Sequence, residues 1–167
     1  MPHDNRSVSV ERTIDAPPEK IFAVVADPAQ HRAIDGSGMV RGPPAGERGR
    51  LLALGDEFGM SMRWGMPYSM VNTVVECEAN RRIAWEPHVA RPAFVRSVMG
   101  GHRWRYELEP VDGGTRVRET YDWSRADPGT RAWIRAAKWP ARARRAMEKT
   151  LERLDTYVTG GDAGGAA

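Results

Sequence analysis

Hydrophobic and polar residues alternate along several stretches of the chain, which is the period of a β-strand with one buried face. The first stretch holds Val8, Val10 and Ile14 on one face, and Arg12 interrupts that face. The Gly- and Pro-rich residues 36–50 form a loop with room for one short strand. The remaining stretches predict strands at residues 58–64, 69–78, 81–87, 103–108 and 115–123.

Helical patterns flank this run of strands. The segment DAPPEKIFAVVAD, residues 15–27, predicts a helix whose first turn tolerates its two prolines. Pro28 ends that helix or starts a second short one that runs through His31. A long helix is predicted over residues 130–158, and Pro140 should kink or split it. The order of these elements is typical of an α+β fold, with helices on one face of an antiparallel sheet.

Three segments carry a resemblance to a known family. They are VERTIDAPPEKIFAVVADP at residues 10–28, GHRWRYELEP at 101–110 and TRVRETYDWS at 115–124. Together with the closing helix, they resemble the START-like helix-grip superfamily, the SRPBCC group, and within it the polyketide cyclase/dehydrase-like branch. The resemblance implies a curved antiparallel sheet of about seven strands around a long C-terminal helix, with two short helices after the first strand.

The length and composition fit a single domain. The chain has 167 residues, and the resemblance places the domain at residues 7–158, between an N-terminal tail at 1–6 and a flexible C-terminal tail at 159–167. The net charge of +3 is too small to indicate a nucleic-acid partner. The single cysteine, Cys77, is predicted to be a small buried residue on a strand.

We recognise neither a signal peptide nor a membrane-spanning segment in the sequence. The N-terminal segment MPHDNRSVSVER lacks the apolar core of a signal peptide. No apolar run approaches the ~20 residues that a membrane span needs. We therefore expect a cytoplasmic protein.

The resemblance also implies a deep apolar cavity between sheet and helix, which in this family holds lipids, sterols, polyketides or plant-type hormones. Methionine adapts to varied ligand shapes, and bulky tryptophans rarely gather in a plain core. Any one of these residues suits core or cavity equally, whereas the set favours a cavity wall. The predicted ligand-binding residues are Met60, Met62, Trp64, Trp85, Trp104, Tyr106, Glu119, Tyr121, Trp123 and Trp133.

Strand alternation places one carboxylate, Glu119, on the inward face. A buried carboxylate is costly unless paired, so a salt bridge with Arg12 of the first strand is the favoured interpretation. The other interpretation is a general acid or base, because burial raises the pKa of a carboxyl group. In that interpretation the candidate catalytic residues are Glu119, His31 and Tyr106. In either interpretation, the hydroxyl of Tyr106 or Tyr121 is a second polar group.

The segment HRAIDGSG, residues 31–38, brings together the residue types of a nucleophilic site. The string is not G-x-S-x-G, and its Asp, Ser and Gly residues are typical of turns. We predict a helix exit and turn near the cavity mouth, where His31 can touch a ligand. The other histidines, His3, His88 and His102, lack metal-ligand spacing, so no metal and no cofactor are expected.

Two surface features leave alternatives open. The long helix is rich in Lys and Arg, which favours a solvated face, with an anionic membrane or an acidic partner as the alternative. The segment HVARPAFVRSVMGG, residues 88–101, is unusually apolar for a loop. It is either a lid or an oligomer contact, and the protein is either a monomer or a homodimer.

These patterns support three functions. The leading one is binding of a small hydrophobic molecule, lipid or polyketide-like, in the cavity. The second is a cyclase, aromatase or dehydratase-like enzyme that uses Glu119 with tyrosine or histidine groups. The third is a regulatory or partner-binding module that uses the basic C-terminal helix.

Overall fold

Seven strands form one antiparallel sheet in the order β1-β7-β6-β5-β4-β3-β2. The computed structural model describes residues 6–46, 49–91 and 100–160. This sheet, together with the helices given below, confirms the predicted α+β class and the curved antiparallel sheet. The strands are β1 (Ser7–Ile14), β2 (Val40–Gly42), β3 (Glu57–Trp64), β4 (Met66–Glu78), β5 (Arg82–Arg91), β6 (Arg103–Val111) and β7 (Gly114–Asp122).

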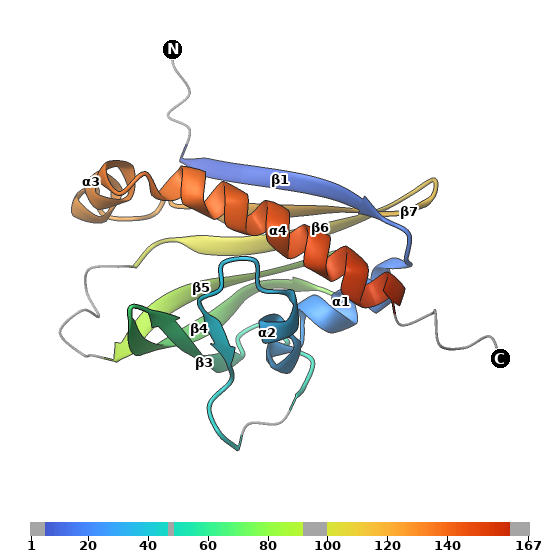
Figure 1. Ribbon diagram of the computed structural model, residues 1–167, viewed down its shortest axis with the longest axis horizontal. Coiled ribbons are helices and arrows are strands. Elements are labelled where there is room, and N and C mark those ends of the chain that lie inside the picture. The colour runs from blue at the N-terminus through green and yellow to red at the C-terminus, as the bar shows by residue number, and fades with distance from the viewer. Residues whose placement is uncertain (1–5, 47–48, 92–99, 161–167) are drawn as a thin grey trace, which may run out of the picture.

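Helices cover one face of the curled sheet, and α4 crosses that face (Figure 1). They are α1 (Pro18–Val25), the 3-10 turn η1 (Pro28–Gln30), α2 (His31–Ile34), α3 (Pro128–Ala136) and α4 (Trp139–Gly160). The apolar side of α4 packs on β1 and β7. Met147, Leu151 and Leu154 of α4 are at most 1 % exposed there. The two short helices predicted after the first strand are present as α1 and α2.

The C-terminal helical segment is split into α3 and α4, as its proline predicts. The break lies at Lys138, whose φ of 51° is left-handed and ends α3. Pro140 then falls in the first turn of α4, where a missing backbone N–H costs no helical hydrogen bond. Asp127 caps α3 by accepting a hydrogen bond from the Thr130 N–H at 3.0 Å. α4 continues to Gly160, two residues past the expected end.

A tight hairpin joins β6 and β7 and sets the register that matters for the cavity. Only Asp112 and Gly113 lie between the paired ends Val111 and Gly114. Gly114 has a φ of 135°, and a Cβ there would lie 2.0 Å from the Ile14 carbonyl oxygen of β1. Glycine is therefore required where the hairpin meets β1. This register pairs residue 106 with residue 119 and residue 104 with residue 121.

The apolar segment at 88–101 is described only in part. Residues 88–91 belong to β5, whereas residues 92–99 lie outside the described residues. The lid and oligomer-contact interpretations of this segment stay predictions. The tail residues 1–5 and 161–167 also lie outside. Within the part of the chain that the structure describes, no helix is both long and apolar enough to cross a membrane.

Candidate functional site

A cavity of about 950 Å³ lies between α4, α2 and the concave face of the sheet. It is at the upper end of the range for small-molecule sites, roughly 300–1,000 Å³. Strands β3 to β7 contribute its wall on one side, and α4 closes the other. Of the predicted ligand-binding residues, the wall includes Met60, Met62, Trp64, Trp85, Trp104, Tyr106, Glu119 and Tyr121.

The two remaining predicted residues stand apart from the cavity. Trp123 is buried in the core, with its ring centroid 5.4 Å from that of Tyr121. Trp133 stands on α3 with 36 % of its surface exposed. Its ring lies 5.9 Å from that of Trp139, which does line the cavity. Trp133 therefore reaches the cavity only through its contact with Trp139.

A row of rings crosses the cavity wall and ends at a carboxyl group. The His31 ring stacks on Trp85 at 5.3 Å, and Trp85 stacks on Tyr106 at 5.7 Å. The Tyr106 hydroxyl donates a hydrogen bond to Glu119 Oε1 at 2.9 Å. The three candidate catalytic residues are thus brought together along one wall. The antiparallel register of β6 and β7 positions the last pair directly opposite each other.

Glu119 is 4 % exposed, and its second oxygen, Oε2, has no hydrogen-bond partner among the described residues. Burial raises the pKa of Glu119 from 4.5 to about 8, which exceeds the lowering effect of the Tyr106 hydrogen bond. The negative charge of Asp35 raises it further. Burial, followed by the proximity of Glu119, also raises the pKa of Tyr106 well above 10. Glu119 is therefore a protonated acid at neutral pH.

The predicted salt bridge between Arg12 and Glu119 is wrong. The register places Val10, not Arg12, opposite Glu119. Arg12 instead reaches the helix and pairs with Asp155 of α4 at 2.7 Å, with 42 % of its side chain exposed. Alternation identified the face that Arg12 occupies, whereas its partner depended on the inter-strand register and on α4.

The segment HRAIDGSG forms a helix exit and a turn, as predicted. The Asp35 carboxylate accepts hydrogen bonds from the backbone N–H groups of Ser37 and Val40, at 2.9 and 3.0 Å. His31 Nε2 donates to the Val25 carbonyl oxygen at 2.9 Å, so the neutral ring leaves Nδ1 without a proton. Burial lowers the pKa of His31 below 6.5. His31 is therefore neutral at pH 7 and faces the cavity.

Several wall residues were missed by the sequence interpretation. Tyr68, Met70 and Asn72 of β4 line the cavity at every second position. That alternation was visible in the sequence, although no face was assigned to this strand. His102, which directly precedes β6, is 7 % exposed and lines the cavity with its ring 5.7 Å from that of Tyr121.

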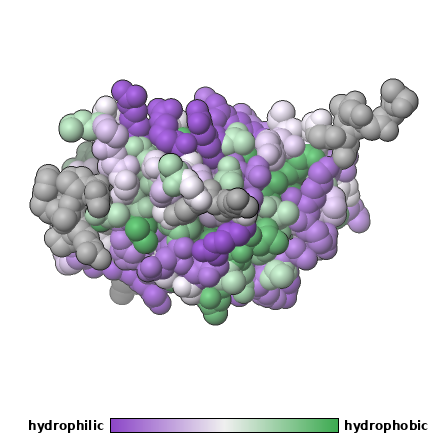
Figure 2. Space-filling view, turned by 90° about the horizontal axis from the view of Figure 1, so that it is seen from below, coloured by the Kyte–Doolittle hydropathy of each residue, from purple (hydrophilic) through white to green (hydrophobic). Residues whose placement is uncertain are grey.

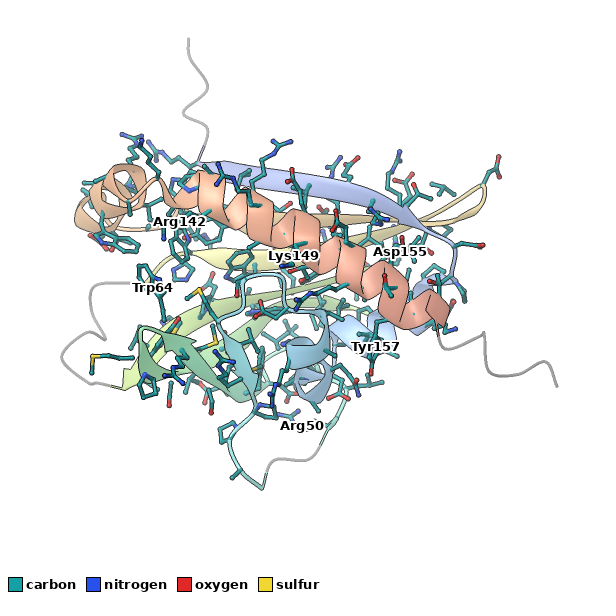
Figure 3. The ribbon with its side chains drawn as sticks, in the orientation of Figure 1. Arg50, Trp64, Arg142, Lys149, Asp155 and Tyr157 are labelled. Carbon is teal, nitrogen blue, oxygen red and sulfur yellow. The ribbon has the colours of Figure 1, made fainter. Side chains whose placement is uncertain are left out.

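The mouth of the cavity combines exposed apolar and basic side chains. Trp64 and Met66, at the turn between β3 and β4, line the cavity and are 53 % and 77 % exposed. Arg142, Arg145 and Lys149 of α4 line it as well and are exposed. Figure 3 shows Arg142 and Lys149 along α4, with Trp64 on the β3 side of that helix.

The described residues offer little for metal chemistry. Across residues 6–46, 49–91 and 100–160, no three His, Cys, Asp or Glu side chains gather closely enough to hold an ion. Burial, with a smaller contribution from Asp56, raises the pKa of Cys77. This thiol is therefore a poor nucleophile at neutral pH.

The sheet wrapped around α4, with the cavity between them, defines a helix-grip fold. Residues 5–159 match the family model described as polyketide cyclase / dehydrase and lipid transport, and the chain belongs to that family. An uncharacterized protein of Mycobacterium tuberculosis is 37 % identical over 127 residues, 73 % of this chain. The chain spans about half the length of this curated relative, 48 %.

Solved structures show the same fold at low sequence identity. A solution structure from Arthrobacter aurescens has a TM-score of 0.67 at 16 % identity, covering 94 % of this chain and 88 % of that one. An AHSA1-like protein from Aeromonas hydrophila has a TM-score of 0.61 at 18 % identity, covering 96 % and 97 %. These likenesses support the START-like helix-grip architecture.

Proposed function

We propose that this domain binds a small hydrophobic molecule, lipid or polyketide-like, in the cavity between the sheet and α4. The observation that carries the proposal is a cavity of about 950 Å³ with a largely apolar wall. Methionines on β3 and β4 adapt to ligand shape, and the aromatic rings of β5 to β7 provide broad contact surfaces. A few polar groups, Glu119 and Tyr106 among them, can orient the ligand.

Binding of neutral alcohols tests this proposal. Octanol and decanol are titrated against the protein by displacement of the neutral dye Nile red. Burial contributes ~0.8 kcal/mol per CH₂ group, so the two extra carbons of decanol should tighten binding about tenfold. Native mass spectrometry of freshly purified protein, compared with the denatured mass, tests for a ligand carried from the cell.

A matched pair of variants locates the binding site. Ala143 of α4 is 3 % exposed and lines the cavity, whereas Ala141 on the same helix is exposed and does not. Ala143→Phe should fill part of the cavity and weaken decanol binding, while Ala141→Phe should leave it unchanged. Circular dichroism checks that both variants fold. Equal decanol affinity in both folded variants would place binding elsewhere, and no alcohol binding to the wild type would refute the proposal.

A second function has its own observation. Glu119 is a buried, protonated acid whose Oε2 lacks a partner, beside the Tyr106 hydroxyl on the cavity wall. Such an acid can protonate a β-hydroxyl group, which leaves as water, while a base such as the unprotonated Nδ1 of His31 takes the α-proton and the carbon–carbon double bond forms. In an enzyme of this kind, Glu119→Gln should retain substrate affinity and lose turnover. Retained turnover of a β-hydroxy polyketide mimic would remove Glu119 from the mechanism.

A further inference from the structure

Three cations of α4 form a cluster at the cavity mouth, which we call the basic rim. They are Arg142, Arg145 and Lys149. Their spacings of three and four residues place them along one side of the helix. All three are exposed, yet all three line the cavity. The basic rim is therefore positioned at the boundary between solvent and an apolar interior.

The basic rim lacks anionic partners within the described part of the chain, whereas its neighbours on α4 are paired. Arg144 pairs with Glu148 at 3.1 Å, and Arg153 donates to the Asp35 carbonyl oxygen. Neither of these two arginines lines the cavity. Among the cations of α4, those that lack a protein partner among the described residues are thus the three that line the cavity.

The acids of the cavity wall do not neutralise the rim. The wall includes two carboxyl groups, those of Asp35 and Glu119. The Asp35 carboxylate is occupied by the Ser37 and Val40 backbone N–H groups and by the Ser37 hydroxyl. Glu119 holds its proton at neutral pH. Three cations against the single ionised carboxylate of Asp35 leave the mouth with an excess of positive charge, beside a wall that is largely apolar.

We propose that the ligand is an amphipathic anion, with its hydrocarbon part in the cavity and its carboxylate or phosphate group against the basic rim. The inference rests on the proposed function and narrows its ligand class. An anionic group is too costly to desolvate in the apolar interior, whereas it gains charge-assisted hydrogen bonds from arginine at the mouth. Figure 2 shows one face of the molecule, on which hydrophobic residues lie among hydrophilic ones.

Ligands that share a ten-carbon chain test the head group. Decanoate, decyl phosphate and decanol are compared by isothermal titration at low and high salt. One cation engaged by a charged head contributes about tenfold in affinity, so an anion should bind at least tenfold more tightly than decanol. Added salt should reduce that advantage and leave decanol unaffected. Decanoate and decyl phosphate separate a preference for carboxylate from one for phosphate.

Adjacent arginines supply the control. Arg145→Gln and Arg144→Gln remove the same charge from neighbouring positions, and only Arg145 lines the cavity. Arg145→Gln should weaken anion binding about tenfold, whereas Arg144→Gln should have little effect. The triple substitution of Arg142, Arg145 and Lys149 to Gln should reduce anion affinity to that of decanol and keep decanol binding.

The outcomes separate the two proposals. If decanol and the anions bind equally, and Arg145→Gln changes neither, the anionic ligand class is refuted while the hydrophobic ligand site stands. If both arginine substitutions weaken anion binding equally, the effect is one of net charge and the basic rim is refuted. If none of the three ligands binds, the proposed function fails and the ligand class fails with it.

Discussion

Glu119 should make the stability of this domain fall as the pH rises. In the unfolded chain its carboxyl group ionises near 4.5, whereas in the fold burial raises the pKa to about 8. Between these values the folded protein binds more protons than the unfolded chain, so the free energy of unfolding decreases with pH. Each pKa unit corresponds to 1.36 kcal/mol, which gives a loss of ~5 kcal/mol between pH 4.5 and 8. Above pH 8 the contribution no longer changes.

The variant Glu119→Gln isolates this effect, because an amide accepts the Tyr106 hydrogen bond and does not titrate. Urea unfolding of both proteins is measured from pH 4.5 to 8.5, and the difference in unfolding free energy is plotted against pH. Other titrating groups are common to both proteins and cancel. The difference should grow by ~5 kcal/mol in favour of the variant.

An exposed acid serves as the control for this measurement. Glu109 lies on β6, with 62 % of its side chain exposed, in a surface pair with Arg116. Glu109→Gln should show no comparable change with pH, because surface pairs contribute little. A constant difference between wild type and Glu119→Gln across the whole pH range would refute the assignment of Glu119 as a neutral buried acid.

Further predictions concern the same wall and the hairpin that supports it. Tyr106→Phe removes the hydrogen bond that lowers the pKa of Glu119, so a ¹³C NMR titration of that carboxyl should give a value above about 8; an unchanged or lower pKa would contradict the geometry. His31 has a lowered pKa, so the unfolded chain binds more protons below pH 6.5 and the folded protein loses stability as the pH falls through that region. His31→Gln should remove this loss in acid unfolding curves, and a loss of equal size in the variant would assign it to other groups. Gly114→Ala should cost about 2 kcal/mol or more, because it adds a clash with β1 to a left-handed φ. Gly113→Ala, at a φ of 85° with open space around it, should cost less in urea unfolding, and equal costs would refute the clash.

Alternation and the family resemblance predicted the sheet, the two short helices and the split in the closing helix. They also placed Glu119 on the inward face, because side-chain direction follows from the period of a strand. The hydrogen-bond partner of Glu119 could not be predicted in the same way. Alternation along a strand identifies the face on which a side chain lies, but not the residue opposite it on the neighbouring strand. The observed register sets Glu119 across from Tyr106 on one side and Val10 on the other, and leaves Arg12 two positions away.

The basic rim could not be predicted from the sequence for a different reason. A run of Lys and Arg on a helix is usually a solvated face, and several of these residues on α4 are exposed in that way. The orientation in which α4 docks on the sheet decides which cations lie over the cavity mouth and which lie over solvent. Arg144 and Arg145 are neighbours with the same side chain, and one is paired with Glu148 while the other lines the cavity.

The loss of folding stability caused by burying Glu119 is informative about the function of the cavity. At neutral pH a glutamine in its place would keep the Tyr106 hydrogen bond and avoid the loss of stability that a buried acid brings. The fold therefore gains nothing at pH 7 from a group that titrates. Residues that cost stability are typical of functional sites, so this cost supports the proposed contact of Glu119 with a ligand or substrate. Oε2 without a protein partner provides the position for that contact. A carrier needs Glu119 only as a hydrogen-bond donor, whereas an enzyme needs its proton to move, and Glu119→Gln separates these because the amide keeps a donor and cannot transfer a proton.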